Sequence, residues 1–147
     1  MAREKFYKKW GFQLDYVYIG IFGCLGAVAR FTISRYFAFT WHSSFPLGTL
    51  VINLAGCLAM GFLLTYSTER LTLSPQLRAG LITGFIGAFT TFSTFSLETL
   101  TLFTKGYITY AILYVLLSVM GGLAAARTGI NMARFTVPLS AGQRSKA

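Results

Sequence analysis

Charged residues are scarce in this sequence. Only 12% of its 147 residues are charged and just four are acidic, whereas 54% are hydrophobic. A soluble domain of this length carries roughly twice that charged fraction. The mean hydropathy of +0.60 agrees, so the composition argues against a water-soluble enzyme. It indicates a small integral membrane protein that forms one domain.

Side chains that perform catalysis or bind transition metals are also few. The single histidine, His42, falls in an expected loop, and the two cysteines, Cys24 and Cys57, fall inside apolar runs. Cysteines at such positions are more typical of small packing residues than of a disulfide, and no Cys/His spacing suggests a metal site. Paired carboxylates, a Ser-His arrangement and a phosphate-binding loop are missing. The sequence therefore predicts that the protein is not an enzyme.

The charge balance is strongly basic, with 13 Lys and Arg, 4 Asp and Glu and a net charge of +9. No basic stripe with interleaved aromatic residues accompanies it, so a nucleic-acid partner is not predicted. Most basic residues flank the apolar runs on one side, at Arg3, Lys5, Lys8, Lys9, Arg70, Arg78, Arg134, Arg144 and Lys146. The other side has little beyond Arg35 and Lys105. The positive-inside rule therefore places both termini in the cytoplasm and the protein in the plasma membrane.

Four apolar runs are each near the ~20 residues that span a bilayer. They cover residues 16–39, 47–66, 77–103 and 107–126. Because lipid offers the backbone no hydrogen bonds, each run is expected to be a helix, which gives an all-α membrane protein. The first run is too long for a signal peptide and is expected to be retained. The predicted organisation is a basic flank at 1–15, a membrane domain at 16–128 and a polar tail at 129–147.

The third run is expected to break within the membrane. It begins with a face of small residues, Gly80, Gly84 and Gly87, which lets another helix approach closely. Five hydroxyl residues and two phenylalanines then fill positions 90–96, and Ser and Thr side chains compete for helical hydrogen bonds. Breaks at this depth line cavities and commonly bind ions. A bent helix whose hydroxyls bond to their own backbone is the alternative.

Isolated polar residues in the second and fourth runs need partners inside lipid. Asn53 shares a helical face with Thr49, Gly56 and Met60, and its amide either joins two helices or lines a pore. In the fourth run, a stripe of helical period contains Tyr107, Tyr110, Tyr114 and Ser118. Tyr107 suits the membrane interface. Tyr114 and Ser118 lie deeper. Either their hydroxyls line a polar region, or the stripe is only a packing surface between helices.

Besides Arg35 and Arg78, which lie near the ends of their runs, two charged residues lie inside the runs. Arg30 shares a face with Gly23 and Gly26, where it anchors structure at an interface or polar cavity, or attracts anions to a vestibule. Glu98 is the only acidic residue within a run. Such carboxylates often couple protons or cations, but a single one does not make a proton relay.

These polar groups suit a small anion better than a cation. Hydroxyls, an amide and an arginine are hydrogen-bond donors, and an aromatic ring is positive at its edge. Phe92 and Phe95 can therefore present ring edges to an anion while hydroxyls replace part of its hydration. Four helices are too few to enclose a pore comfortably, so a dimer is expected, with the glycine faces as its surfaces.

Three motifs resemble the Fluc/CrcB fluoride channels of microbes. They are GCLGAVAR at 23–30, GT at 48–49 followed by NLAG at 53–56, and GFIGAFTTFSTF at 84–95. The resemblance runs from about residue 20 to residue 127, in the family's order and spacing. The threonine-phenylalanine stretch is highly specific, whereas the glycine motifs alone would be weak.

The resemblance implies an antiparallel, dual-topology dimer with two pores that exports cytoplasmic fluoride passively and protects the cell from fluoride. It assigns Phe92 and Phe95 as pore phenylalanines and Asn53 as the pore amide. It places Thr49, Tyr114 and Ser118 along a polar track, Glu98 near one pore end and Arg30 near a vestibule. It also implies a structural sodium ion held by the backbone carbonyls of Gly87 and Thr90. Carbonyl ligation of a hard cation needs no acidic side chain.

Two features depart from the family pattern. Gly122 stands where a hydroxyl often follows Ser118 by one turn, so that part of the track is expected to be hydrated differently. The Lys and Arg count favours one orientation, although an antiparallel homodimer needs both. A homodimer is the expected assembly, and a heterodimer with a homologue of opposite orientation is the alternative.

Two other functions remain open at this stage. A small-multidrug-type, proton-coupled exporter also has four spans and dual topology, but it should carry a carboxylate in its first span, where this chain has Arg30. A non-transporting assembly subunit would use the hydroxyl stretch only for packing. Substitution of Phe92 or Phe95 would then leave cells indifferent to fluoride.

Overall fold

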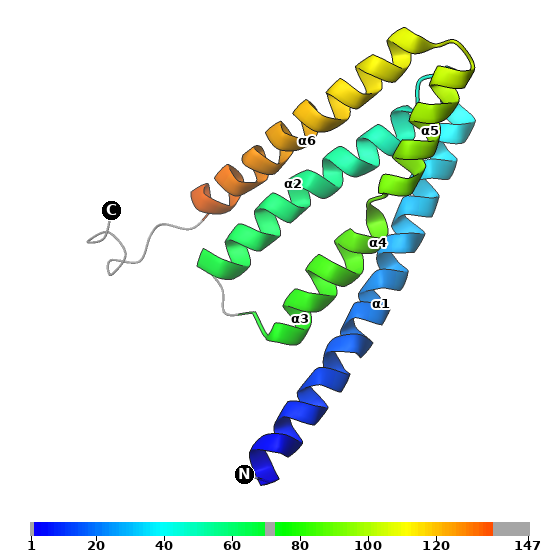
Figure 1. Cartoon of the computed structure of the whole chain (residues 1–147). Coiled ribbons are helices and arrows are strands. Elements are labelled where there is room, and N and C mark those ends of the chain that lie inside the picture. The colour runs from blue at the N-terminus through cyan, green and yellow to red at the C-terminus, as the bar shows by residue number, and fades with distance from the viewer. Residues whose placement is uncertain (1, 70–72, 137–147) are drawn as a thin grey trace.

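The computed structural model describes residues 2–69 and 73–136, and within these ranges the chain is helical without a β-strand (Figure 1). The elements, in chain order, are α1 (Ala2–Thr40), α2 (Leu47–Glu69), α3 (Pro75–Ala79), the π-helix η1 (Gly80–Ile86), α4 (Gly87–Phe89), α5 (Phe92–Thr104) and α6 (Ile108–Phe135). The segments α3, η1, α4 and α5 follow one another to form the third span. The prediction of an all-α protein is confirmed.

Four helical stretches in the described residues are long and apolar enough to cross a membrane. They are Leu14–Thr40, Leu47–Glu69, Pro75–Thr104 and Ile108–Phe135. The four predicted spans are therefore confirmed, but the first helix begins earlier and the last ends later than expected. No proline follows Ala126 before Pro138, so nothing in the sequence stops α6 at the membrane surface.

The later end of α6 corrects the position of Arg134. It belongs to the last turn of α6 and not to a polar tail, and its guanidinium pairs with the Glu69 carboxylate at the end of α2, at 2.8 Å. Residues 137–147 of the predicted tail, with Arg144 and Lys146, lie outside the described residues, as does Arg70.

Two helix pairs are closed by glycine. Helix α2 lies beside α6, and a Cβ at Gly61 or Gly129 would collide with a carbonyl oxygen of the other helix. Helix α1 lies along η1, where a Cβ at Gly84 would stand 2.6 Å from the Ile19 carbonyl oxygen. Such close approach of backbones is what small residues permit between membrane helices.

This packing corrects the expectation that the glycine faces are dimer surfaces. Gly26, Gly80 and Gly84 are occupied by contacts between α1 and the third span of the same chain. Gly87, by contrast, has nothing within 4 Å of the position of a Cβ. The sequence pattern identified close helix contacts but not whether they lie within or between chains.

The buried core is small. It centres on Leu50, Leu102, Ala111 and Tyr114, and the apolar windows of the four spans are only 6–28% buried. So much exposed apolar surface is normal for helices that face lipid or a second subunit.

The two ends of the bundle differ in what they bring together. The 41–46 connection between α1 and α2 and the short turn between α5 and α6 meet at one end, whereas the N-terminus lies at the other (Figure 1). We call the first the loop end.

Candidate functional site

The third span is interrupted at two residues. Helix α4 ends at Phe89, Thr90 and Thr91 are extended (φ −81° and −148°), and α5 begins at Phe92. The break predicted over 90–96 is therefore real but shorter. The later hydroxyls do not unwind the helix. Ser96 Oγ bonds to a carbonyl of its own helix, Phe92 O, at 2.9 Å, and the hydroxyls of Ser93 and Thr94 bond to Thr91 Oγ1 at the start of that helix.

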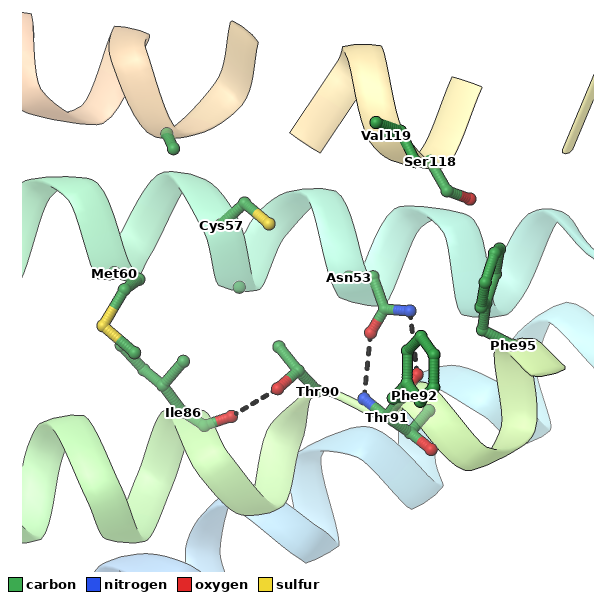
Figure 2. Close-up of a pocket in the computed structure, with 12 residues that line it drawn as sticks. Asn53, Cys57, Met60, Ile86, Thr90, Thr91, Phe92, Phe95, Ser118 and Val119 are labelled. Atoms are coloured by element: carbon green, nitrogen blue, oxygen red, sulfur yellow. Dashed lines mark hydrogen bonds between the residues drawn. The ribbon is translucent and has the colours of Figure 1, made fainter. Parts of the chain in front are cut away.

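Asn53 of α2 satisfies the extended backbone at the break. Its Nδ2 donates to the Thr91 carbonyl at 3.0 Å, and the Thr91 N–H donates to its Oδ1 at 2.9 Å. Figure 2 shows this pair of bonds across the gap between α2 and the break. The amide oxygen thus replaces the acceptor that a continuous helix would supply for the Thr91 N–H, since unpaired backbone groups in lipid are costly.

The same break redirects the hydrogen bonds of two carbonyls. In a continuous α-helix, the carbonyls of Gly87 and Thr90 would accept from the N–H groups of Thr91 and Thr94. The Thr91 N–H instead donates to Asn53, and the Thr94 N–H donates to Thr91 Oγ1 at 3.2 Å. The helical donors of both carbonyls are therefore used elsewhere.

A groove of about 430 Å³ runs past the break, between α2, α6 and the third span (Figure 2). We call it the break groove. The residues that line it include Asn53, Cys57, Met60, Thr90, Phe92, Phe95 and Ser118. Phe92 is 81% exposed. The Ser118 hydroxyl oxygen is buried and has no hydrogen-bond partner among the described residues.

Three aromatic rings lead from the groove toward Glu98. The centroids of Phe92 and Phe95 are 5.8 Å apart, and those of Phe95 and Tyr114 are 5.1 Å apart. Both pairs are tilted, with interplanar angles of 38° and 50°. Such arrangements offer the positive ring edge as well as the negative face to a neighbour.

The Glu98 carboxyl of α5 accepts two hydroxyl hydrogen bonds. Thr49 donates to Oε1 at 2.9 Å, and Tyr114 donates to Oε2 at 2.7 Å. Thr49 and Tyr114 are buried on α2 and α6, so Glu98 ties three helices together. We refer to these three residues as the Glu98 cluster.

The structure thus brings most of the predicted site residues into two neighbouring groups. Asn53, Phe92, Phe95 and Ser118 line the break groove, together with Thr90, while Thr49, Tyr114 and Glu98 form the adjoining cluster.

Arg30 is different, because it lies on α1 and lines neither the groove nor the loop-end cavity described below. Cys57 and Met60 also line the groove, although Cys57 was interpreted only as a packing residue. Its thiol and that of Cys24 are free.

Comparison with known proteins gives one family and a consistent name. Residues 17–130 match the model of the family described as CrcB-like protein, Camphor Resistance (CrcB). The chain is 53% identical over 125 residues to "Fluoride-specific ion channel FluC 1" of Moorella thermoacetica, covering 85% of this chain and 88% of that protein. It is 42% identical over 125 residues to the protein of the same name from Bacillus cereus, covering 85% and 91%. A "Fluoride-specific ion channel FluC" of Stutzerimonas stutzeri is 44% identical over 112 residues, covering 76% and 90%.

Proposed function

The chain belongs to the CrcB family, and from this membership we propose that it is a fluoride-specific ion channel, which lets cytoplasmic fluoride leave the cell down its electrochemical gradient. It crosses the plasma membrane four times and is a channel, not an enzyme. The observation that carries the proposal is the match to channels of that name along most of the chain. Nothing in the site favours a proton-coupled exporter.

The break groove is the wall along which fluoride would move. The unpartnered Ser118 hydroxyl offers a donor at the groove, and the exposed Phe92 ring and its neighbour Phe95 offer edges beyond it. These donors would replace part of the hydration of a small anion, the role that pore-lining dipoles take in other selective channels. The Glu98 cluster lies at the end of the aromatic row.

A second subunit is needed to close the path, because the groove is open in a single chain. We propose an antiparallel, dual-topology homodimer with two pores, in which each copy covers the groove of the other. The exposed Phe92 and the open Gly87 support a partner at this face. A heterodimer with a homologue of opposite orientation is the alternative that the uneven basic flanks suggest.

The break also has the chemistry of a structural sodium site. The Gly87 and Thr90 carbonyls have lost their helical donors to Asn53 and Thr91, and hard cations prefer such oxygen ligands. Gly87 leaves open space beside its backbone. These carbonyls, with those of a second copy, would hold sodium at the dimer interface, where the ion would stabilise the assembly.

The function is tested by fluoride efflux from liposomes that contain only the purified chain, in sodium buffer with a potassium ionophore. Rapid efflux of fluoride but not chloride, without a proton gradient, is the expected result. Flux that requires a proton gradient would identify an exporter. If the folded protein is silent alone and remains silent with a neighbouring homologue, the channel function is wrong; rescue by the homologue identifies a heterodimer.

Sodium and topology have separate tests. Replacing sodium with a large organic cation should abolish efflux and dissociate the dimer, whereas an unchanged dimer would contradict the sodium site. For topology, Ser43 lies exposed in the 41–46 connection. A Ser43→Cys variant, with Cys24 and Cys57 replaced by Ser, should react with an impermeant thiol reagent in about half its copies if both orientations insert. Labelling of all copies or none contradicts dual topology.

A further inference from the structure

A second cavity lies at the loop end of the bundle. It has a volume of about 350 Å³ and is lined by the 41–46 connection, by α5 and by the turn before α6. Its polar side chains are those of Ser43, Ser44, Glu98, Thr101, Lys105 and Tyr107. We call it the loop-end cavity. Glu98 belongs both to its lining and to the Glu98 cluster. The cavity therefore begins where the aromatic row of the break groove ends.

The cavity has two sources of negative potential. One is the Glu98 carboxyl, which accepts hydrogen bonds from two neutral hydroxyls. The other is the C-terminal end of α5, which terminates at Thr104 and carries the negative end of the helix dipole. An anion that approaches Glu98 from the loop end needs a positive charge that offsets both.

Lys105 is the one basic side chain in the lining of this cavity. In the described part of the chain the only ion pair joins Arg134 and Glu69, so the Lys105 ammonium is not neutralised there by a carboxylate. It follows Glu98 by seven residues, about two helical turns or ~10 Å along the axis. The cation therefore lies farther out than the carboxylate, toward the loop end.

The end of α5 fixes where Lys105 leaves the helix. The Gly106 N–H donates to Phe103 O at 3.1 Å, and the Tyr107 N–H donates to Leu102 O at 2.9 Å. Gly106 has φ +81°. This pair of bonds with a left-handed glycine is a Schellman cap, and it makes Lys105 the capping residue. The position of the lysine is thus part of a defined turn and not of a loose loop.

We propose that Lys105 is the electrostatic attractor for fluoride at the loop-end cavity, which is one mouth of the conduction path. This inference rests on the proposed function and names the residue that raises the local fluoride concentration at that mouth. A fixed charge at the outer rim of a cleft speeds the arrival of an ion of opposite sign, and the effect falls with ionic strength. In an antiparallel dimer the two mouths would open on opposite faces of the membrane, so the attractor would act from both sides.

The test compares initial rates of fluoride efflux for the full chain and its Lys105→Arg, Lys105→Gln and Lys105→Glu variants. Vesicles of phosphatidylcholine alone remove anionic lipid as a binding partner of the lysine. Arg35→Gln is the matched control, because Arg35 lies near the same end but packs on the rings of Phe31 and Phe39 outside the cavity. Ionic strength is set with sodium gluconate at about 0.01 M, where the Debye length is ~30 Å, and at about 1 M, where it is ~3 Å.

At low ionic strength we expect Lys105→Gln to lower the rate by about threefold and Lys105→Glu by about tenfold, with Lys105→Arg and Arg35→Gln unchanged. At high ionic strength the four variants should converge on the wild-type rate. Equal rates at low salt, or a loss that salt does not relieve, would overturn the role of Lys105 while leaving a conducting wild-type channel. A wild-type chain without fluoride flux would instead overturn the proposed function, and this inference with it.

Discussion

Helix α2 meets its two neighbours in opposite ways. Toward α6 the backbones touch, because Gly61 and Gly129 leave room for carbonyl oxygens of the opposite helix. Toward the break in the third span, a single polar side chain, Asn53, bridges a gap with two hydrogen bonds to Thr91. The first contact is steric and closed, whereas the second is polar and borders a groove.

The α2–α6 contact stabilises the fold, whereas the break in the third span borders the groove proposed for the ion. At Gly61 and Gly129 the α2–α6 contact leaves no room for a Cβ. The break keeps extended backbone at membrane depth only because Asn53 satisfies it, and it leaves Phe92 exposed. Substitutions at the two regions should therefore fail differently, the first by loss of folded protein and the second by loss of flux.

The largest effect is expected at the α2–α6 contact. Gly129→Leu would drive its side chain into the Leu58 carbonyl and the backbone of Phe62, a worse case than ordinary overpacking at about 1–3 kcal/mol. Size-exclusion chromatography in detergent should show little or no monodisperse protein. Gly20→Leu is the control, since nothing lies within 4 Å of a Cβ there; equal yields of the two variants would refute the steric contact.

Removal of the Asn53 bridge should abolish flux before it abolishes the fold. Asn53→Ala leaves the N–H of Thr91 unpaired, at about 1–3 kcal/mol for a buried group, and removes the amide bond to the Thr91 carbonyl. We expect a lower Tm, protein that still elutes as a single peak, and fluoride efflux reduced by more than about tenfold, equivalent to roughly 1.4 kcal/mol. Efflux at the wild-type rate would show that the break does not need Asn53.

A smaller effect is expected within the Glu98 cluster. Tyr114→Phe removes the 2.7 Å hydrogen bond to Glu98 but keeps the ring that packs on Phe95. Stability should fall by about 1–2 kcal/mol, as for other hydrogen bonds of this kind, with efflux lowered several-fold and elution unchanged. Thr49→Val, which removes the other hydroxyl donor, should act in the same direction. If Tyr114→Phe does not fold, the Glu98 cluster maintains the fold, as the α2–α6 contact does, and the expected difference between the two regions is wrong there.

The smallest effect is expected at Gly122, one turn beyond Ser118. A Cβ there would meet only Cys57 Sγ, at 3.4 Å, so Gly122→Ser should change stability by no more than about 0.5 kcal/mol. Efflux should equal or exceed the wild-type rate, because a hydroxyl is added to the polar stripe. Gly129→Ser on the same helix is the contrast and should lower the Tm clearly; similar Tm values for the two variants would contradict the distinction between these glycines.

Periodicity and composition were sufficient to predict the four spans and the interruption of the third. Each rests on local physics: spans on apolar length, and the break on hydroxyls that compete with the helix at Thr90 and Thr91. The place where the helix resumes was not predictable, because Ser96 bonds to its own helix and not away from it. The extension of α6 brings Arg134 to Glu69, a contact between residues far apart in the sequence.

The candidate site was only partly accessible to the same reasoning. A buried amide must have a partner, so Asn53 was marked by its position in an apolar run, but its partner Thr91 became evident only in three dimensions. The resemblance to a family supplied the phenylalanines and the carbonyls of Gly87 and Thr90. Nothing in the sequence except its charge marks Lys105 as a site residue. Lys105 and Glu98 line the same cavity because of how α5 ends and where the 41–46 connection lies.

The central claim is that fluoride passes the break beside Phe92, and one pair of substitutions tests it most directly. Phe92→Ile removes the aromatic ring edge at the groove, and Phe103→Ile makes the same exchange on α5 at an exposed position outside it. Both variants are reconstituted alone, and fluoride and chloride efflux are measured in sodium buffer. We expect wild-type fluoride efflux from Phe103→Ile and none from folded Phe92→Ile. Undiminished fluoride efflux from Phe92→Ile would contradict the claim.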